Sequence, residues 1–232
     1  MLIGAHQPLF IPWIGYFDKI NRVDLFVIVD DVQFTSSGWI RRNSIKGSLG
    51  PLTLNVPIKK RILLETKINE VRIDNQMNSI WKKCHLKSIQ LNYGRAKYFL
   101  DFFSQLSNLY EKHFEMLSDL NIEIIKLICS YLEIKTKIVL SSEIKATGHK
   151  TDLIIDLCEK NSATSFMLGM GGSNNYADRD KIESKGIKIV QQNFIHPFYS
   201  QLFGEFIPNL SVLDLIFNEG PNSCEILNKS TN

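Results

Sequence analysis

Several features that would assign this chain to a protein class are missing from its 232 residues. Its four cysteines are far apart in sequence, so they form neither a CxxC pair nor the Cys/His spacing of a zinc site. The apolar runs are far shorter than the roughly 20 residues that cross a bilayer. The apolar start is interrupted by His6-Gln7 and lacks the basic region of a signal peptide. We therefore expect reduced core thiols, no metal site, no membrane span and a cytoplasmic protein.

The chain also lacks a strong charge imbalance. Its 27 basic and 24 acidic residues leave a net charge of only +3, whereas nucleic-acid-binding proteins usually carry a long basic stripe. No internal repeat or low-complexity segment divides the sequence, and 44% of the residues are hydrophobic. That composition is sufficient for one large core. The sequence therefore predicts one domain over residues 1–232 and no nucleic-acid partner.

Strand and helix patterns alternate at both ends of the chain. Buried strands are predicted at 2–6 and 24–31, with a helix between them. The same alternation resumes after the middle of the chain, with strands at 137–140, 164–168 and 187–192 and helices at 151–161 and 178–186. Repeated β-α units predict an α/β fold whose mostly parallel sheet is covered by helices on both faces.

The middle of the chain has a different pattern. Residues 34–75 predict a β-rich insertion, in which 51–58 and 68–73 alternate apolar and polar residues like strands. Residues 77–132 show helical spacing and predict three successive helices, the first of them with Ile80, Cys84 and Ile89 on one face.

Polar residues follow the predicted strands, where open parallel sheets bind ligands. His6 and Gln7 follow the first strand, and Asp30, Asp31 and Gln33 follow the second. The His6 imidazole suits a base or a phosphate partner, although it can equally be a core histidine beside a turn. Adjacent aspartates in an extended segment point to opposite faces, so at most one of the pair faces a given pocket.

Two further segments suit anion binding. "GWIRRN" offers Trp39 for a nucleobase and Arg41 and Arg42 for phosphate, with a solvated turn as the alternative. "GMGGSNNY" follows a strand and contains Gly171, Gly172, Ser173, Asn174 and Tyr176. Its glycines let backbone N–H groups approach a phosphate, although the segment is neither a Walker loop nor GxGxxG and a flexible connection is the alternative. Because parallel strands share a carboxyl edge, we predict that His6, Asp31, Asn43 and this loop converge on one cleft.

Polar residues elsewhere have simpler explanations. "WKKCHLK" at 81–87 is typical of a solvated basic helix face, and neighbouring Cys84 and His85 on a helix point about 100° apart, too far for a catalytic pair. Ser211 and Asp214 have the spacing of a capping box at the start of a helix.

Taken together, "AHQPLFIPWIGYFDKINRVDLFVIVDDVQF", "GWIRRN", "LNVPIKK", "WKKCHLKSI" and "FIPNLSVLDLIFNEGP" resemble the WbqC-like family of bacteria over nearly the whole chain. The resemblance implies a role in O-antigen or related polysaccharide clusters, where a glycine transferase activity has been suggested for a member. It also implies that the substrate is an amino sugar carried on a nucleotide. The family motifs fall on His6, Gln7, Pro8, Pro12, Trp13, Gly15, Tyr16, Asp30, Asp31, Gln33, Trp39, Arg42, Asn43, Asn209, Ser211, Asp214, Asn218 and Gly220.

The hypothesis that follows is an N-acyltransferase that moves an aminoacyl group, such as glycyl, to the amine of the nucleotide-linked sugar. His6, or else Asp31, is the expected base, and Gln7 or Asn43 the expected donor to the oxyanion. The expected donor of the aminoacyl group is a carrier-protein thioester or an ATP-activated amino acid, and no other cofactor is expected. The other candidate residues are assigned to substrate binding: Trp13, Tyr16, Gln33, Trp39, Arg41, Arg42, Gly171, Gly172, Ser173, Asn174, Tyr176, Asn209, Ser211 and Asn218.

Two alternatives remain open. One is nucleotidyl transfer, although the chain lacks the HxGH element and the KMSKS-like loop of adenylyltransferases. The other is a non-catalytic module that binds nucleotide sugars.

Overall fold

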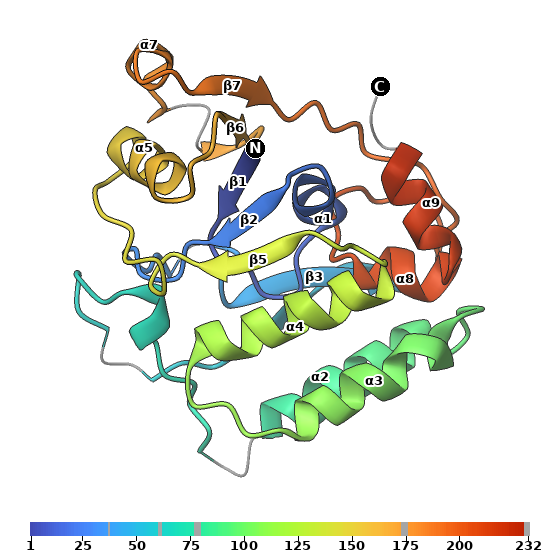
Figure 1. Cartoon of the computed structure of the whole chain (residues 1–232). Helices are drawn as coiled ribbons and strands as arrows, with labels where there is room; N and C mark the ends of the chain where they lie inside the picture. Colours follow the sequence, from blue (N-terminus) through green and yellow to red (C-terminus); the bar gives the residue numbers. More distant parts are fainter. Residues whose placement is uncertain (37, 60–61, 77–79, 173–175, 230–232) are drawn as a thin grey trace.

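A five-stranded parallel sheet forms the centre of the computed structural model, which describes residues 1–36, 38–59, 62–76, 80–172 and 176–229 (Figure 1). The strand order is β5-β2-β1-β6-β7, and all four pairings are parallel. The strands are β1 (Leu2–His6), β2 (Leu25–Ile28), β5 (Lys137–Leu140), β6 (Ser165–Leu168) and β7 (Lys188–Gln191). The predicted parallel α/β sheet is confirmed.

Alternate side chains of the strands enter two separate cores, as the pleat requires. Phe26 and Ile28 of β2 join the larger core, which includes residues of α1 (Ile14–Asn21) and α4 (Leu117–Tyr131). Leu25 and Val27 enter the smaller core, which includes residues of α5 (Thr151–Lys160) and α7 (Arg179–Glu183). Helices therefore cover both faces of the sheet, as predicted.

The β-rich insertion contains the antiparallel pair β3 (Arg42–Gly47) and β4 (Gly50–Asn55), so the predicted strand at 51–58 is confirmed as far as Asn55. The predicted strand at 68–73 is wrong. Residues Ile68–Glu70 form a 3-10 turn, η1, which is closed by hydrogen bonds from the Glu70 N–H to the Lys67 carbonyl (3.0 Å) and from the Val71 N–H to the Ile68 carbonyl (3.2 Å). After it, Arg72 and Ile73 take part only in isolated bridges.

Three helices follow as predicted: α2 (Ile80–Tyr93), α3 (Phe99–Glu111) and α4, which lie side by side in Figure 1. The predicted inner face of α2 is wrong for Ile80 and Cys84, which are exposed, and confirmed for Ile89, which is buried together with His85 and Tyr93. His85 is therefore not part of a solvated basic face. Its Nε2 contacts the backbone of Asn55 on β4, which orients α2 toward the insertion.

The chain ends in α8 (Leu213–Glu219) and α9 (Asn222–Lys229), which pack beside α3 and α1. The predicted helix start is confirmed, and Ser211 Oγ accepts a hydrogen bond from the Leu213 N–H (3.3 Å). Asp214 does not complete a capping box, because its buried carboxylate accepts a hydrogen bond from the Tyr93 hydroxyl (2.7 Å). Within the described ranges, no helix has the length and apolar character needed to cross a bilayer.

Candidate functional site

A cavity of about 690 Å³ opens at the carboxyl ends of β1 and β6. The chain leaves β1 toward β2 on one side of the sheet and later enters β6 on the other side, so these two neighbours form the topological switch point. Open α/β sheets bind ligands in the crevice at this position. The cavity therefore lies where the fold leaves room for a ligand.

His6, the last residue of β1, lines the cavity with its ring held in place. Its Nδ1 lies 3.0 Å from the Gln7 carbonyl, which also accepts a hydrogen bond from the Tyr16 hydroxyl (3.1 Å). Burial and the nearby Lys19 ammonium lower the pKa of His6 to about 4, so the imidazole is neutral at pH 7. The Nδ1 proton is donated to the Gln7 carbonyl, and Nε2 is then the basic nitrogen. No described residue makes a hydrogen bond to this Nε2.

Lys19 of α1 is a cavity residue that the sequence analysis missed. Its side chain is 3% exposed, and its Nζ donates to the Ala5 carbonyl (2.9 Å). Burial lowers the pKa of Lys19 from 10.5 to about 8, which leaves the amine charged at pH 7. The only available signal was its position three residues after Tyr16, on the same side of the helix.

The glycine-rich segment after β6 forms another wall of the cavity, through Gly169, Met170, Gly171 and Gly172. Ser173 and Asn174, which were predicted to bind substrate, lie outside the described residues. At the far end of the segment, Tyr176 also lines the cavity, together with His149 and Lys150 just before α5.

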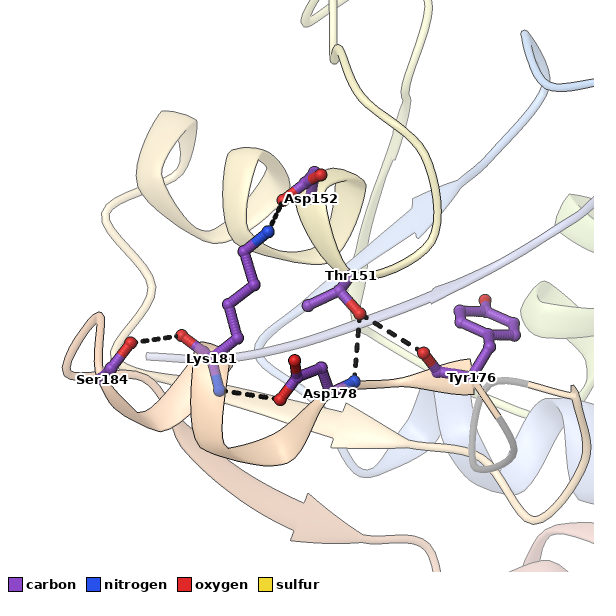
Figure 2. A network of polar contacts seen from close by, with 6 residues as sticks. All are labelled: Thr151, Asp152, Tyr176, Asp178, Lys181 and Ser184. Atoms are coloured by element: carbon purple, nitrogen blue, oxygen red, sulfur yellow. Dashed lines mark hydrogen bonds and ion pairs between the residues drawn. The ribbon is translucent and has the colours of Figure 1, made fainter.

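A polar network attaches this wall to the start of α5 and to α7 (Figure 2). Thr151 Oγ1 donates to the Tyr176 carbonyl (3.4 Å) and accepts from the Asp178 N–H (3.0 Å). Asp178 caps α7 through the Lys181 N–H (3.0 Å), and Lys181 Nζ forms an ion pair with Asp152 (2.6 Å). These contacts hold Tyr176 next to the first turn of α5.

The predicted convergence of His6 and the glycine loop on one cleft is confirmed, because His6, Gly171 and Gly172 line the same cavity. Five other predicted residues also line it, namely Gln7, Trp13, Tyr16, Gln33 and Tyr176. The common cause is the shared carboxyl edge of neighbouring parallel strands.

Asp31 does not converge with them, which corrects that part of the prediction. Its carboxylate accepts a hydrogen bond from Ser141 Oγ, in the turn after β5. The adjacent Asp30 accepts from Ser142 Oγ (2.7 Å) and the Ser142 N–H (3.1 Å). The two aspartates therefore join the end of β2 to the turn after β5, and neither is among the described residues that line the cavity.

Asn43 is also absent from the described lining, and its amide is bonded to the loop between His6 and α1. Its Nδ2 donates to the carbonyls of Ile11 (2.7 Å) and Phe10 (3.3 Å). A second buried amide, that of Asn121, donates to the carbonyl of Pro8 (2.9 Å). Both amides therefore support the loop that connects His6 to α1.

The remaining predicted residues lie around this loop and near the C-terminus rather than among the described lining residues: Trp39, Arg41, Arg42, Asn209, Ser211 and Asn218. Trp39 is 55% exposed, and Arg41 and Arg42 are half-buried at the start of β3. Asn218 donates to the Asp214 carbonyl within α8 (2.7 Å). Ser211 is joined to the site, because its backbone forms a bridge with the cavity residue Trp13.

Comparison with known proteins places this architecture in a family. A model of the WbqC-like protein family matches residues 7–226. The chain belongs to the WbqC-like family. It is similar to the uncharacterized protein Rv1507c of Mycobacterium tuberculosis (strain ATCC 25618 / H37Rv), with 34% identity over 227 residues, or 97% of this chain and 96% of the relative. No solved structure was found to match the chain.

The opening motif of this WbqC-like protein supplies several residues of the cavity wall. His6, Gln7, Trp13 and Tyr16 line the cavity, and Gly15, which also lines it, gives the Trp13 ring room to pack. A Cβ at Gly15 would lie 2.2 Å from Trp13 Cη2, so any larger residue must displace the ring from the cavity wall. The motif therefore builds one side of the site.

Proposed function

We propose that this WbqC-like protein transfers an aminoacyl group, such as glycyl, from an activated donor to the amine of a nucleotide-linked amino sugar. The observation that supports this most strongly is the neutral imidazole of His6 at the switch-point cavity. Amide formation needs a group that accepts the proton of the attacking amine, and a neutral imidazole with an unoccupied nitrogen suits this role. The cavity volume of about 690 Å³ is also within the usual range for small-molecule sites.

The proposed step begins when the sugar amine attacks the carbonyl carbon of the donor. The new N–C bond forms, the carbonyl electrons move to oxygen, and His6 Nε2 takes a proton from the ammonium. When the tetrahedral adduct collapses, the bond to the leaving group breaks and that group receives the proton. The leaving group is the thiol of a carrier protein or the phosphate of an ATP-activated amino acid. Gln7, the next residue along the cavity wall, is the proposed donor to the oxyanion.

A pKa near 4 makes His6 a weak base in the empty site. The ammonium group of a tetrahedral adduct is a much stronger acid than the ammonium form of the free amine, so a weak base such as His6 can still accept its proton. A bound anion would also oppose the effect of Lys19 and raise the pKa of His6. The proposed base therefore becomes stronger when substrate is present. Asp31 is a weaker candidate, because its carboxylate is already bonded to Ser141.

The test is a His6→Gln variant assayed with a dTDP-linked amino sugar and either glycine with ATP or a glycyl carrier protein. Mass spectrometry of the amide product measures turnover. We expect turnover to fall by about 10²- to 10⁴-fold, with little change in sugar-nucleotide affinity. Asp31→Asn is the matched control, and its turnover per folded molecule should stay near that of the wild type.

Three outcomes would contradict the proposal. No amide with any amino-sugar acceptor would remove the reaction, provided that the protein is folded. Pyrophosphate release from ATP in the absence of both glycine and sugar would favour nucleotidyl transfer instead. Tight binding of the sugar nucleotide without turnover would indicate a binding module.

A further inference from the structure

The charge of Lys19 has no counter-ion within the part of the chain that the structure describes. Its Nζ donates to the Ala5 carbonyl and lies 5.9 Å from the centre of the Phe166 ring, and none of the ion pairs involves it. The neighbouring Asp18 is occupied elsewhere, because its Oδ2 accepts from Gln192 (2.8 Å) and pairs with Arg22 (3.7 Å). An ammonium buried without a partner charge is unfavourable unless something else compensates it.

The cavity around this amine is electropositive. Its ionisable lining comprises Lys19, Lys150, His6, His149 and Tyr176, and among the described lining residues there is no aspartate or glutamate. Such a surface attracts an anion and repels a cation. The composition of the cavity thus supplies a second argument, because Lys150 adds a second positive charge to that of Lys19 and no carboxylate of the described lining balances them.

The path of the Lys19 side chain also places the charge close to His6. The Lys19 side chain crosses β1 at Gly4, where an added Cβ would lie 3.5 Å from Lys19 Cε. The amine of Lys19 then reaches the Ala5 carbonyl beside His6. A neutral donor could satisfy that carbonyl at a much smaller desolvation cost than a lysine. Bonding to Ala5 therefore does not account for the positive charge.

We propose that Lys19 is the cationic partner of an anionic group, a phosphate or a carboxylate, carried by the ligand of this cavity. This inference rests on the proposed function, because the two substrates of the proposed reaction are the two sources of the anion. One source is the diphosphate of the sugar nucleotide, and the other is the carboxyl group of the amino-acid donor. In either case the anion lies beside Lys19 and the His6 imidazole.

Calorimetry with the full chain tests this without any turnover, using inorganic pyrophosphate and dTDP as phosphate probes and N-acetylglycine as the carboxylate probe. Lys19→Met removes the charge, and Lys19→Gln removes it while keeping a donor for the Ala5 carbonyl. Lys87→Met is the matched control, because it removes the same charge from an exposed position of α2. Circular dichroism confirms that each variant is folded.

We expect the wild type and Lys87→Met to bind one probe class alike, and both Lys19 variants to bind it about 10- to 100-fold more weakly. Preference for pyrophosphate and dTDP assigns the phosphate, and preference for N-acetylglycine assigns the carboxylate. Unchanged affinity in the folded Lys19→Gln variant overturns the inference, as does a wild type that binds no probe.

If neither Lys19 variant folds, the ¹³Cε resonance of Lys19 in the wild type provides the test. It should shift on saturation with the bound probe, and an unchanged resonance overturns the inference. Because these experiments contain no activated donor, absence of amide formation would refute the proposed reaction while leaving the binding result intact.

Discussion

Replacing Lys19 with methionine is expected to stabilise the empty protein. Burial lowers the pKa of Lys19 from 10.5 to about 8, a difference of about 2.5. At about 1.36 kcal/mol for each pKa unit, the charged amine costs about 3 kcal/mol of folding free energy at pH 7. The methionine variant avoids this cost but loses the hydrogen bond to the Ala5 carbonyl, which lowers its stability by about 1–2 kcal/mol. The variant should therefore be about 1–2 kcal/mol more stable than the wild type.

The stability advantage of Lys19→Met over the wild type should fall as the pH rises. Below pH 8 Lys19 is charged in both the folded and the unfolded protein, so the full cost of burial is present. Between pH 8 and 10.5 the folded protein loses the proton first, and the stability of the wild type rises relative to that of the variant. The advantage of Lys19→Met should thus shrink as the pH is raised from 7 to 10.

Urea unfolding at pH 7 and pH 10 measures both effects, with Lys87→Met as the control for loss of an exposed helical charge. A Lys19→Met protein that is less stable than the wild type at pH 7 would show that the lysine serves the fold. An advantage that does not change with pH would show that the burial cost is not the cause.

Two further substitutions test the walls of the cavity. Gly15→Ala should change the tryptophan fluorescence and weaken binding of the calorimetric probes by at least about 10-fold, because its Cβ would lie 2.2 Å from Trp13 Cη2; Lys87→Met, at an exposed position of α2, is again the control. Unchanged fluorescence and affinity would contradict the role given to Gly15. Asn43→Ala should lower the free energy of unfolding by about 2–3 kcal/mol in urea titrations, because the carbonyls of Phe10 and Ile11 lose their donor. If Asn43→Ala is instead fully stable but inactive, Asn43 is an oxyanion donor after all.

The sequence was sufficient to predict the sheet and the place of the site, because both follow from periodicity and topology. His6 and Gly171 are distant in sequence, yet parallel neighbours must end at the same edge. The sequence was not sufficient to predict Lys19, because lysine is normally exposed and helical periodicity alone does not reveal that one is buried. The same limit misplaced part of the inner face of α2, where His85 rather than Ile80 faces the core.

Asp31 and Asn43 show a different limit, which concerns what a polar residue is used for. A carboxylate or an amide after a strand has the same appearance in sequence whether it contacts a ligand or satisfies backbone groups. The alternative partners here are Ser141 in a distant turn and the carbonyls of the loop after β1. Only the three-dimensional arrangement decides between them.

The loop after β1 explains why buried amides are needed so near the cavity. Ile11 has a φ of 41°, a left-handed conformation that a β-branched residue adopts only at a cost of about 1–3 kcal/mol. The hydrogen bonds from Asn43 and Asn121 are made to backbone carbonyls of this loop and offset that cost. Because both ends of the loop carry cavity residues, His6 and Trp13, the strain and the amides together fix one wall of the site. We infer that two groups of residues build this wall. His6 and Trp13 line the cavity, and Asn43 and Asn121 hold the loop that carries them in position.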